Sequence, residues 1–272
     1  MSDPDTAIPH LGHRFMQMHA AGTFVMVNVA DAGTARAVTE AGAAAIATTS
    51  SGHAATIGRR DAAGDVSMEE HAAHTEALAR ASTVPCNVDA ENGYGHRPED
   101  MAAAVKRFAA TGAGGMGIED WSGDPDTGLY DRSLAAARIE AAVEAAASLD
   151  HPFVITGRTE VLLYGLDGGL DEALARLRAF AEVGAHCLYA PGTWDIDTVR
   201  AVVDGAGGPV NVLVALGPPP HLPSGSTTMT FGDLAEAGVR RISIGGGLYQ
   251  SQVRFAADLV RRLLLDGNFR RL

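Results

Sequence analysis

The chain has few cysteines, and neither of them suggests a disulfide or a metal site. Cys86 and Cys187 are the two cysteines among 272 residues, and both lie in apolar stretches typical of buried strands. Free cysteine is often buried as a small core residue. No Cys-x-x-Cys or His-x-x-x-His pattern accompanies the expected strand ends, so the sequence does not favour a zinc site.

Positive charge and long apolar runs are also scarce. The sequence has 21 Lys and Arg against 33 Asp and Glu, a formal net charge of −12. Nucleic acid and anionic membrane surfaces are therefore poor partners. The longest apolar run, from Phe24 to Ala30, is too short to span a bilayer. The start of the chain has no basic segment followed by an apolar core, so we expect no signal peptide and a reduced cytoplasmic location.

What the chain does contain is a regular alternation of apolar segments and helical patterns. Hydrophobic residues make up 46% and charged residues 20%, which is typical of a globular protein. We expect strands at 23–29, 44–48, 86–89, 116–119, 153–158, 187–190, 210–216 and 241–244. Helices are expected at 32–40, from Ser67, and at 98–112, 133–148, 170–183, 195–203, 231–237 and 249–265. The segment 49–65 reads as a polar loop.

This alternation predicts an α/β fold with a parallel sheet. The strands lack period-two polarity, which indicates burial on both faces. Glycines that cap helices recur at Gly42, Gly112, Gly184 and Gly238, each just before an apolar strand. Eight strand-then-helix units favour a closed (β/α)8 barrel, a TIM barrel, over an open sheet, and no Gly-x-Gly-x-x-Gly follows the first strand. We expect one domain over residues 1–272.

Two carboxylates stand at the end of the third expected strand. Asp89 and Glu91 are two residues apart, so their side chains can point the same way, and Gly93 and Gly95 follow at once. Such a pair suits a hard divalent cation with oxygen ligands, Mg²⁺ or Mn²⁺. The alternative is an ordinary solvated acidic turn.

An arginine ends the fifth expected strand, where a parallel barrel carries its chemistry. Arg158 follows the apolar run from Phe153 to Gly157. An unpaired charge buried there would reduce the stability of the fold by several kcal/mol. Neighbouring acids, among them Glu119 and Glu160, could neutralise it. If those acids instead hold a cation, Arg158 is free to bind a substrate carboxylate or phosphate.

Several motifs in one order resemble the isocitrate lyase/phosphoenolpyruvate mutase superfamily. The resemblance runs from Phe24 to about Phe255. Its carriers are Thr48–Gly52, Asp61 after Ile57–Arg60, Val88–Gly95, Gly117–Asp120, Gly157–Glu160, Ala190–Gly192, Pro209–Val212 and Gly238–Gly245.

The resemblance implies an architecture and a cofactor. It implies an α/β barrel whose last helix is exchanged between paired subunits, in a homodimer or homotetramer. It also implies Mg²⁺ held largely through water by Asp89, Glu91 and Glu119.

The same resemblance implies how a small anionic carboxylate substrate is bound. Ser51, Gly52 and His53 would present backbone donors to one carboxylate, and Arg158 would bind the anionic end. Asn211 would line the substrate site. Asp61 would lie close to the reacting group, so that Asp61, Arg158 and Glu119 form the expected catalytic set.

One segment departs from the pattern of that superfamily. Its carbon–carbon lyases carry Lys-(Lys/Arg)-Cys-Gly-His after the Glu-Asp pair, and the cysteine acts as an acid. Here residues 121–130 contain no Cys, Lys or His. Cleavage of isocitrate or methylisocitrate by that route is not expected, and the asparagine-bearing loop of the phosphonate mutases is also absent.

Three functions follow as hypotheses. The leading one is a Mg²⁺-dependent lyase that breaks a C–C bond in a small 2-oxo or 2-hydroxy carboxylic acid through an enolate, as in decarboxylation of an oxaloacetate-like substrate. The second is a phosphonopyruvate-type mutase or hydrolase acting on a P–C bond. The third is a barrel that binds a metabolite without catalysis. Asp61, His53 and Tyr94 are the candidate proton donors.

Overall fold

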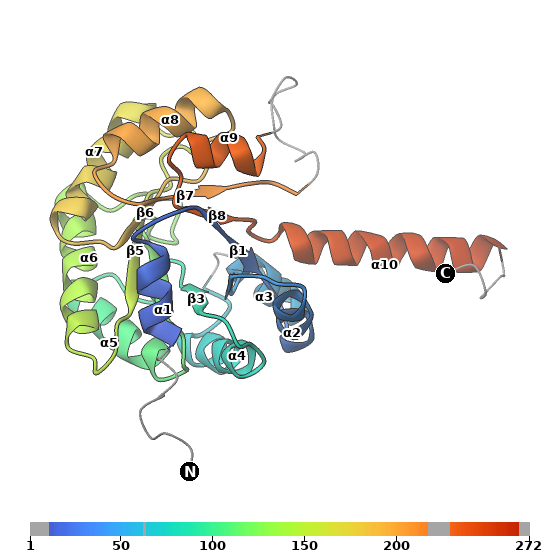
Figure 1. The fold of residues 1–272 in the computed structure, drawn as a ribbon. Helices are drawn as coiled ribbons and strands as arrows, with labels where there is room; N and C mark the ends of the chain where they lie inside the picture. The colour runs from blue at the N-terminus through green and yellow to red at the C-terminus, as the bar shows by residue number, and fades with distance from the viewer. Residues whose placement is uncertain (1–10, 62–63, 217–228, 267–272) are drawn as a thin grey trace, which may run out of the picture.

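Eight parallel strands close into a barrel in the computed structural model, which describes residues 11–61, 64–216 and 229–266 (Figure 1). The strands follow one another around the barrel in chain order, and β8 pairs with β1. This confirms the predicted α/β barrel. The strands are β1 (Phe24–Asn28), β2 (Ala45–Ala47), β3 (Cys86–Asp89), β4 (Gly115–Glu119), β5 (Val154–Arg158), β6 (Cys187–Tyr189), β7 (Val210–Leu213) and β8 (Arg241–Ser243).

Helices follow the strands and surround most of the barrel (Figure 1). Segment 49–65, expected as a loop, contains the short helix α3, so that prediction was incomplete. The helices are α1 (Leu11–Met18), α2 (Ala32–Glu40), α3 (Ser50–Thr56), α4 (Met68–Arg80), α5 (Pro98–Ala109), α6 (Arg132–Ala147), α7 (Gly169–Glu182), α8 (Ile196–Gly205), α9 (Phe231–Glu236) and α10 (Gly247–Asp266).

Helix starts are set by local side-chain caps that the sequence had indicated. Asp31 caps α2 by accepting a hydrogen bond from the Thr34 backbone N–H at 2.8 Å. Ser67 and Glu70 form a capping box at the start of α4. Pro98 occupies the first turn of α5, where its missing N–H costs nothing.

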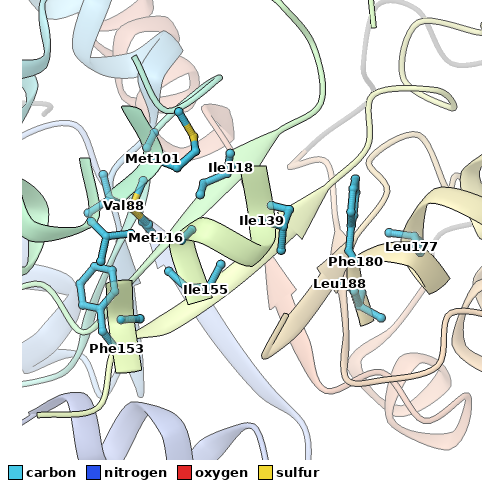
Figure 2. Packing of buried hydrophobic residues seen from close by; sticks show 14 of the residues in the cluster. Val88, Met101, Met116, Ile118, Ile139, Phe153, Ile155, Leu177, Phe180 and Leu188 are labelled. Carbon is cyan, nitrogen blue, oxygen red and sulfur yellow. The ribbon is translucent and has the colours of Figure 1, made fainter. Parts of the chain in front are cut away.

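The main apolar core lies between the strands and the surrounding helices. Figure 2 shows part of it, with Met116 and Ile118 from β4, Ile155 from β5 and Phe180 from α7. Cys86 and Cys187 are free and buried, as expected. Because these apolar side chains face outward from the barrel, its interior is left for the polar residues described below.

One end of the barrel is covered by α1. Phe15 of this helix is fully buried, and its ring lies 6.2 Å from the ring of Phe24 at the start of β1. Substitution of Gly115, at the start of β4, would bring a Cβ within 3.1 Å of the Phe15 ring. The amino-terminal end of the strands is therefore closed, which leaves the carboxyl-terminal end as the mouth.

Beyond its first turn, where Leu248 packs against the core, helix α10 extends away from the barrel (Figure 1). Several of its apolar side chains are exposed, and Phe255 is 69% exposed. A hydrogen bond of 3.0 Å from Gln252 to the Thr34 hydroxyl links it to α2. Across the described residues, no helix combines the length and the apolar character needed to cross a membrane.

Candidate active site

The mouth of the barrel gathers three carboxylates around one guanidinium. Arg158 Nη1 lies 3.3 Å from Asp89 Oδ1 and 3.0 Å from Glu119 Oε1. Its Nε donates to Glu160 Oε1. Glu119 and Arg158 are direct neighbours in the β4–β5 register, which places their side chains on the same face of the sheet. The acids that the sequence placed at strand ends therefore face one another.

Glu91 reaches this cluster from a strained turn. Its backbone has a positive φ of 49°, which is uncommon for a residue other than glycine. Gly93 follows with φ 77°, and a Cβ there would lie 2.5 Å from Met101 Sδ. Gly93 thus meets both a conformational and a steric requirement, as its place beside the carboxylates had suggested.

A buried arginine that sequence reasoning missed holds this turn in place. Arg138 of α6 is 1% exposed, and it donates to the carbonyl oxygens of Glu119 and Gly95, at 3.0 Å each, and of Asn92. Its guanidinium also lies 4.1 Å from the centroid of the Tyr130 ring. The one sequence signal was a charged residue within the alanine-rich stretch of α6.

Asp120 supports the mouth from behind. Its carboxylate pairs with Arg176 Nη1 at 3.1 Å and accepts a hydrogen bond from the Glu160 backbone N–H at 3.0 Å. Both of its oxygens are therefore engaged by neighbouring elements, so Asp120 positions Glu160, which follows β5 and its last residue Arg158.

Burial and nearby negative charge raise the pKa values of two glutamates at the mouth, Glu91 and Glu119. Burial, then the charges of Asp89 and Asp61, raises the pKa of Glu91 to about 7. Burial also raises the pKa of Glu119, against the opposing charge of Arg158. Several carboxylates with raised pKa values in one place indicate negative charge that a cation would stabilise.

The donor set fits a hard divalent cation bound largely through water. Asp89, Glu91 and Glu119 offer only oxygen ligands, the type that Mg²⁺ and Mn²⁺ prefer. Within the described part of the chain, no three His, Cys, Asp or Glu side chains form a ready-made cation cage. Water between the cation and these acids would satisfy both observations, so the three ligands stay a prediction.

Two cavities meet at the carboxylates. The first, of about 180 Å³, runs from Ser51 and Asp61 at the rim past Asp89 and Arg158 to Arg241 in the barrel interior. Asn211, which we predicted to line a substrate site, also lies along this cavity. The second, of about 410 Å³, is lined by residues on the other side of the cluster, among them Glu91, Glu119, Tyr94, His96 and Trp121.

Helix α3 links the rim to the metal-site candidate. The Ser50 backbone N–H and hydroxyl both donate to Asp89 Oδ2, at 3.0 and 3.2 Å. Ser51 lines the first cavity, whereas Gly52 and His53 line neither cavity. The His53 backbone N–H donates to the Thr49 carbonyl at 2.9 Å, and its ring stacks on His74 with centroids 3.8 Å apart. Of the three predicted carboxylate donors, the structure brings only Ser51 to the cavity.

Behind α3 lies a buried histidine. His71 is 1% exposed. Its ring nitrogens bond to the Tyr94 hydroxyl at 2.6 Å and to Thr48 Oγ1 at 3.1 Å, and Thr48 Oγ1 accepts from the Asp89 N–H at 2.8 Å. Burial lowers the pKa of His71 to about 3, so the neutral ring supports the backbone of Asp89.

Segment 121–130 is folded over the second cavity. The Asn92 side chain donates to the Ser122 carbonyl at 2.9 Å, and the Ser122 hydroxyl accepts from the Asp124 N–H at 3.2 Å. The ring of Trp121 lies 4.7 Å from that of Tyr164, which follows β5. The segment thus forms a wall next to Glu91 and Glu119 without a cysteine, lysine or histidine of its own.

The chain is similar in part to characterised enzymes. It is 32% identical to 2-methylisocitrate lyase of Escherichia coli (strain K12) over 47% of this chain and 44% of that protein. It is 30% identical to oxaloacetate decarboxylase of Rhodopseudomonas palustris (strain BisB5) over 57% of this chain and 52% of that protein. The chain thus spans about half the length of these curated relatives.

Likeness to solved structures extends over nearly the whole chain. A structure from Burkholderia cenocepacia J2315, described as a lyase/mutase, has a TM-score of 0.86 at 37% identity and covers 95% of this chain and 90% of its own. Phosphonopyruvate hydrolase in complex with oxalate and Mg²⁺ has a TM-score of 0.83 at 24% identity, with coverage of 96% and 89%, and shows the shared fold.

The match to a protein family is equally extensive. The family of phosphoenolpyruvate phosphomutase matches residues 15–264, which include every strand of the barrel and all the acids at its mouth. The resemblance drawn from the motifs is thereby confirmed. The chain belongs to the phosphoenolpyruvate phosphomutase family.

Proposed function

We propose that this protein is a Mg²⁺-dependent lyase, for which Mn²⁺ could substitute, that breaks a C–C bond in a small 2-oxo or 2-hydroxy carboxylic acid. Decarboxylation of an oxaloacetate-like substrate is the leading case. The observation that supports it most directly is the contact of Arg158 with Asp89 and Glu119 beside a cavity of about 180 Å³. Such a cavity is small, which suits a small acid.

The chain's own residues have distinct tasks in this proposal. Asp89, Glu91 and Glu119 would hold the cation, which supplies Lewis-acid stabilisation of negative charge on the substrate oxygens. Once those acids have a cation, Arg158 can turn its donors to the remote carboxylate of the substrate. Ser51, which lines the cavity at its rim, would donate to the other carboxylate of the substrate.

The test is loss of oxaloacetate with Mg²⁺. We expect turnover by the wild type and a loss of at least about 100-fold in Asp89→Ala, because that acid contacts both α3 and Arg158. Asp197→Ala, which removes an exposed carboxylate, is the matched control and should leave the rate unchanged. Absence of turnover by the wild type, or a fully active Asp89→Ala, refutes the proposal.

The second candidate is P–C bond chemistry, which the family match favours. It would use the same cation and the same arginine. Phosphorus NMR of the protein with phosphonopyruvate and Mg²⁺ separates the two: a single phosphonate signal that persists excludes mutase and hydrolase activity. Tight oxalate binding without turnover of any 2-oxo acid would instead indicate a barrel that only binds metabolites.

We also propose that α10 packs against a second copy of the chain. Its exposed apolar side chains, which include Val253, Phe255, Val260 and Leu264, have no cover in one copy. Light scattering after size-exclusion chromatography should show a dimer or tetramer, and Phe255→Asp should shift it towards the monomer. Arg254→Asp, one residue away on the same helix, is the control for added negative charge. A monomeric wild type contradicts this assembly.

A further inference from the structure

A row of polar residues crosses the barrel beside the proposed site. In the strand register Arg158 pairs with Tyr189, Tyr189 with Asn211, and Asn211 with Arg241. All four side chains line the first cavity. Lateral neighbours in a sheet lie about 4.8 Å apart, so each can contact the next.

The far end of this row is a buried positive charge with uncharged partners. Arg241 is 2% exposed. It donates to Asn211 Oδ1 at 2.9 Å and Thr156 Oγ1 at 3.0 Å, and its Nη1 lies 3.3 Å from His19 Nε2. Burial, then Arg241 itself, lowers the pKa of His19 to about 3, so that ring is neutral. No carboxylate of the described chain pairs with this guanidinium.

The hydrogen bonds of the row run in one direction. A guanidinium can only donate, so Asn211 must present its carbonyl oxygen to Arg241 and its amide nitrogen to the next partner. That nitrogen donates to Ser243 Oγ at 2.9 Å. Ser243 and Tyr189 both line the first cavity, and the Ser243 hydroxyl lowers the pKa of the Tyr189 phenol. A donor chain that begins at a cation thus reaches Ser243, whose hydroxyl favours negative charge on the phenol oxygen.

Tyr189 is placed to reach a substrate. Its ring centroid lies 5.0 Å from Arg158 Cζ, beside the proposed carboxylate site, and its side chain is only partly covered. Burial raises its pKa to about 12 against the charge of Arg158, with Glu160 and Asp89 as the nearby acids. The phenol therefore carries its proton at neutral pH.

The other candidate donors are less well placed. The His53 ring stacks on His74 outside both cavities. The Tyr94 hydroxyl is bonded to His71 and lines the second cavity, away from Arg158. Asp61 lies exposed at the rim. Tyr189 alone among these four combines a ring beside Arg158 with a place in the wall of the first cavity.

We propose that Tyr189 is the catalytic acid that protonates the enolate carbon, and that Ser243, Asn211 and Arg241 are positioning residues for it. This inference rests on the proposed lyase function. The Oη–H bond of Tyr189 breaks and a C–H bond forms from the carbon–carbon π pair of the enolate. The enolate oxygen becomes the carbonyl oxygen, and water returns a proton to the phenolate.

The test measures proton transfer separately from bond cleavage. Exchange of the pyruvate methyl protons into D₂O, read by proton NMR with Mg²⁺ present, reports the acid–base step, and CO₂ release from oxaloacetate reports cleavage. Tyr189→Phe should lower exchange by about 100-fold or more. Its CO₂ release should fall much less, and its oxalate affinity should stay within about twofold, because the ring over Arg158 is kept.

Matched variants separate a chemical role from a structural one. Tyr164→Phe removes an exposed phenol at the same mouth and should exchange like the wild type. Ser243→Ala removes the hydroxyl that lowers the pKa of the Tyr189 phenol, so the pH at which exchange rises should increase. A structural role alone would not move that profile.

The outcomes are distinguishable. If the wild type releases CO₂ and exchanges pyruvate protons but Tyr189→Phe exchanges equally fast, the role of Tyr189 is refuted and the lyase function stands. If the wild type does neither, the proposed function fails and this inference fails with it.

Discussion

Two arginines inside the same barrel have opposite surroundings. Arg158, at the mouth, contacts the carboxylates of Asp89, Glu119 and Glu160. Arg241, deeper in the barrel, bonds only to the neutral groups of Asn211, Thr156 and His19 among the described residues. One charge is neutralised by its neighbours, and the other is only solvated by dipoles.

The difference assigns the two charges different tasks. A guanidinium held by acids can exchange partners when a cation and an anionic substrate arrive together, because the total charge then stays balanced. A guanidinium among neutral dipoles keeps its positive potential whatever binds at the mouth. The first is suited to binding, and the second is suited to a constant influence on neighbours such as Tyr189.

Removal of the Arg158 charge, which neighbouring acids neutralise, should have the largest effect on stability. Arg158→Met leaves the buried carboxylates of Glu119 and Glu160 and the half-buried carboxylate of Asp89 without their positive partner, so the free energy of unfolding in chelator at pH 8 should fall by about 3–5 kcal/mol. Denaturant titration measures it. Arg200→Met, at an exposed ion pair, should change stability by no more than about 0.5 kcal/mol. Equal effects of the two variants would contradict the arrangement at the mouth.

The acids themselves should then produce a pH dependence. Because folding raises the pKa of Glu91 from 4.5 to about 7, its contribution to stability is fully present below pH 4.5 and is lost as pH rises to about 7. The loss should be about 3 kcal/mol in chelator. Glu91→Gln removes this titration, so unfolding of variant and wild type at pH 4.5 and pH 8 isolates it. A difference that does not depend on pH would refute the shift.

Removal of the Arg241 charge, which has only neutral partners among the described residues, should have the smallest effect on stability. Arg241→Met leaves acceptors on Asn211 and Thr156 without a donor, which should cost about 1–3 kcal/mol. The cost is limited because the buried charge, itself unfavourable, disappears with the side chain. Denaturant titration against the same Arg200→Met control measures it. A loss greater than that of Arg158→Met would reverse the comparison between the two arginines.

Local sequence signals predicted most of the elements and part of the site. Helix α2 runs over the predicted residues 32–40, because Asp31 and the glycine after the helix mark both ends. Strand β3 has its predicted bounds, but Glu91 lies beyond it in a turn with a positive φ, so the period of a strand, which was expected to align Glu91 with Asp89, does not apply there. Helix α3 was missed because its seven residues carry few apolar side chains with a helical repeat.

Contacts between distant segments could not be predicted in the same way. Arg138 reaches a turn more than 40 positions earlier, and the bond from His71 to Tyr94 joins a helix to a different strand end. The row from Arg158 to Arg241 depends on the register of four strands. A sequence pattern reports which residues are apolar or charged, but not which of them become neighbours when the barrel closes.

The order of strands and helices, the glycine turn at Gly93 and the acids at the strand ends were determined by the sequence itself, because each depends on residues a few positions apart. Barrel closure decided the rest. It placed Arg158 among three acids and Arg241 beside none of the acids that the structure describes, since the partners of a buried charge are set by the register of neighbouring strands.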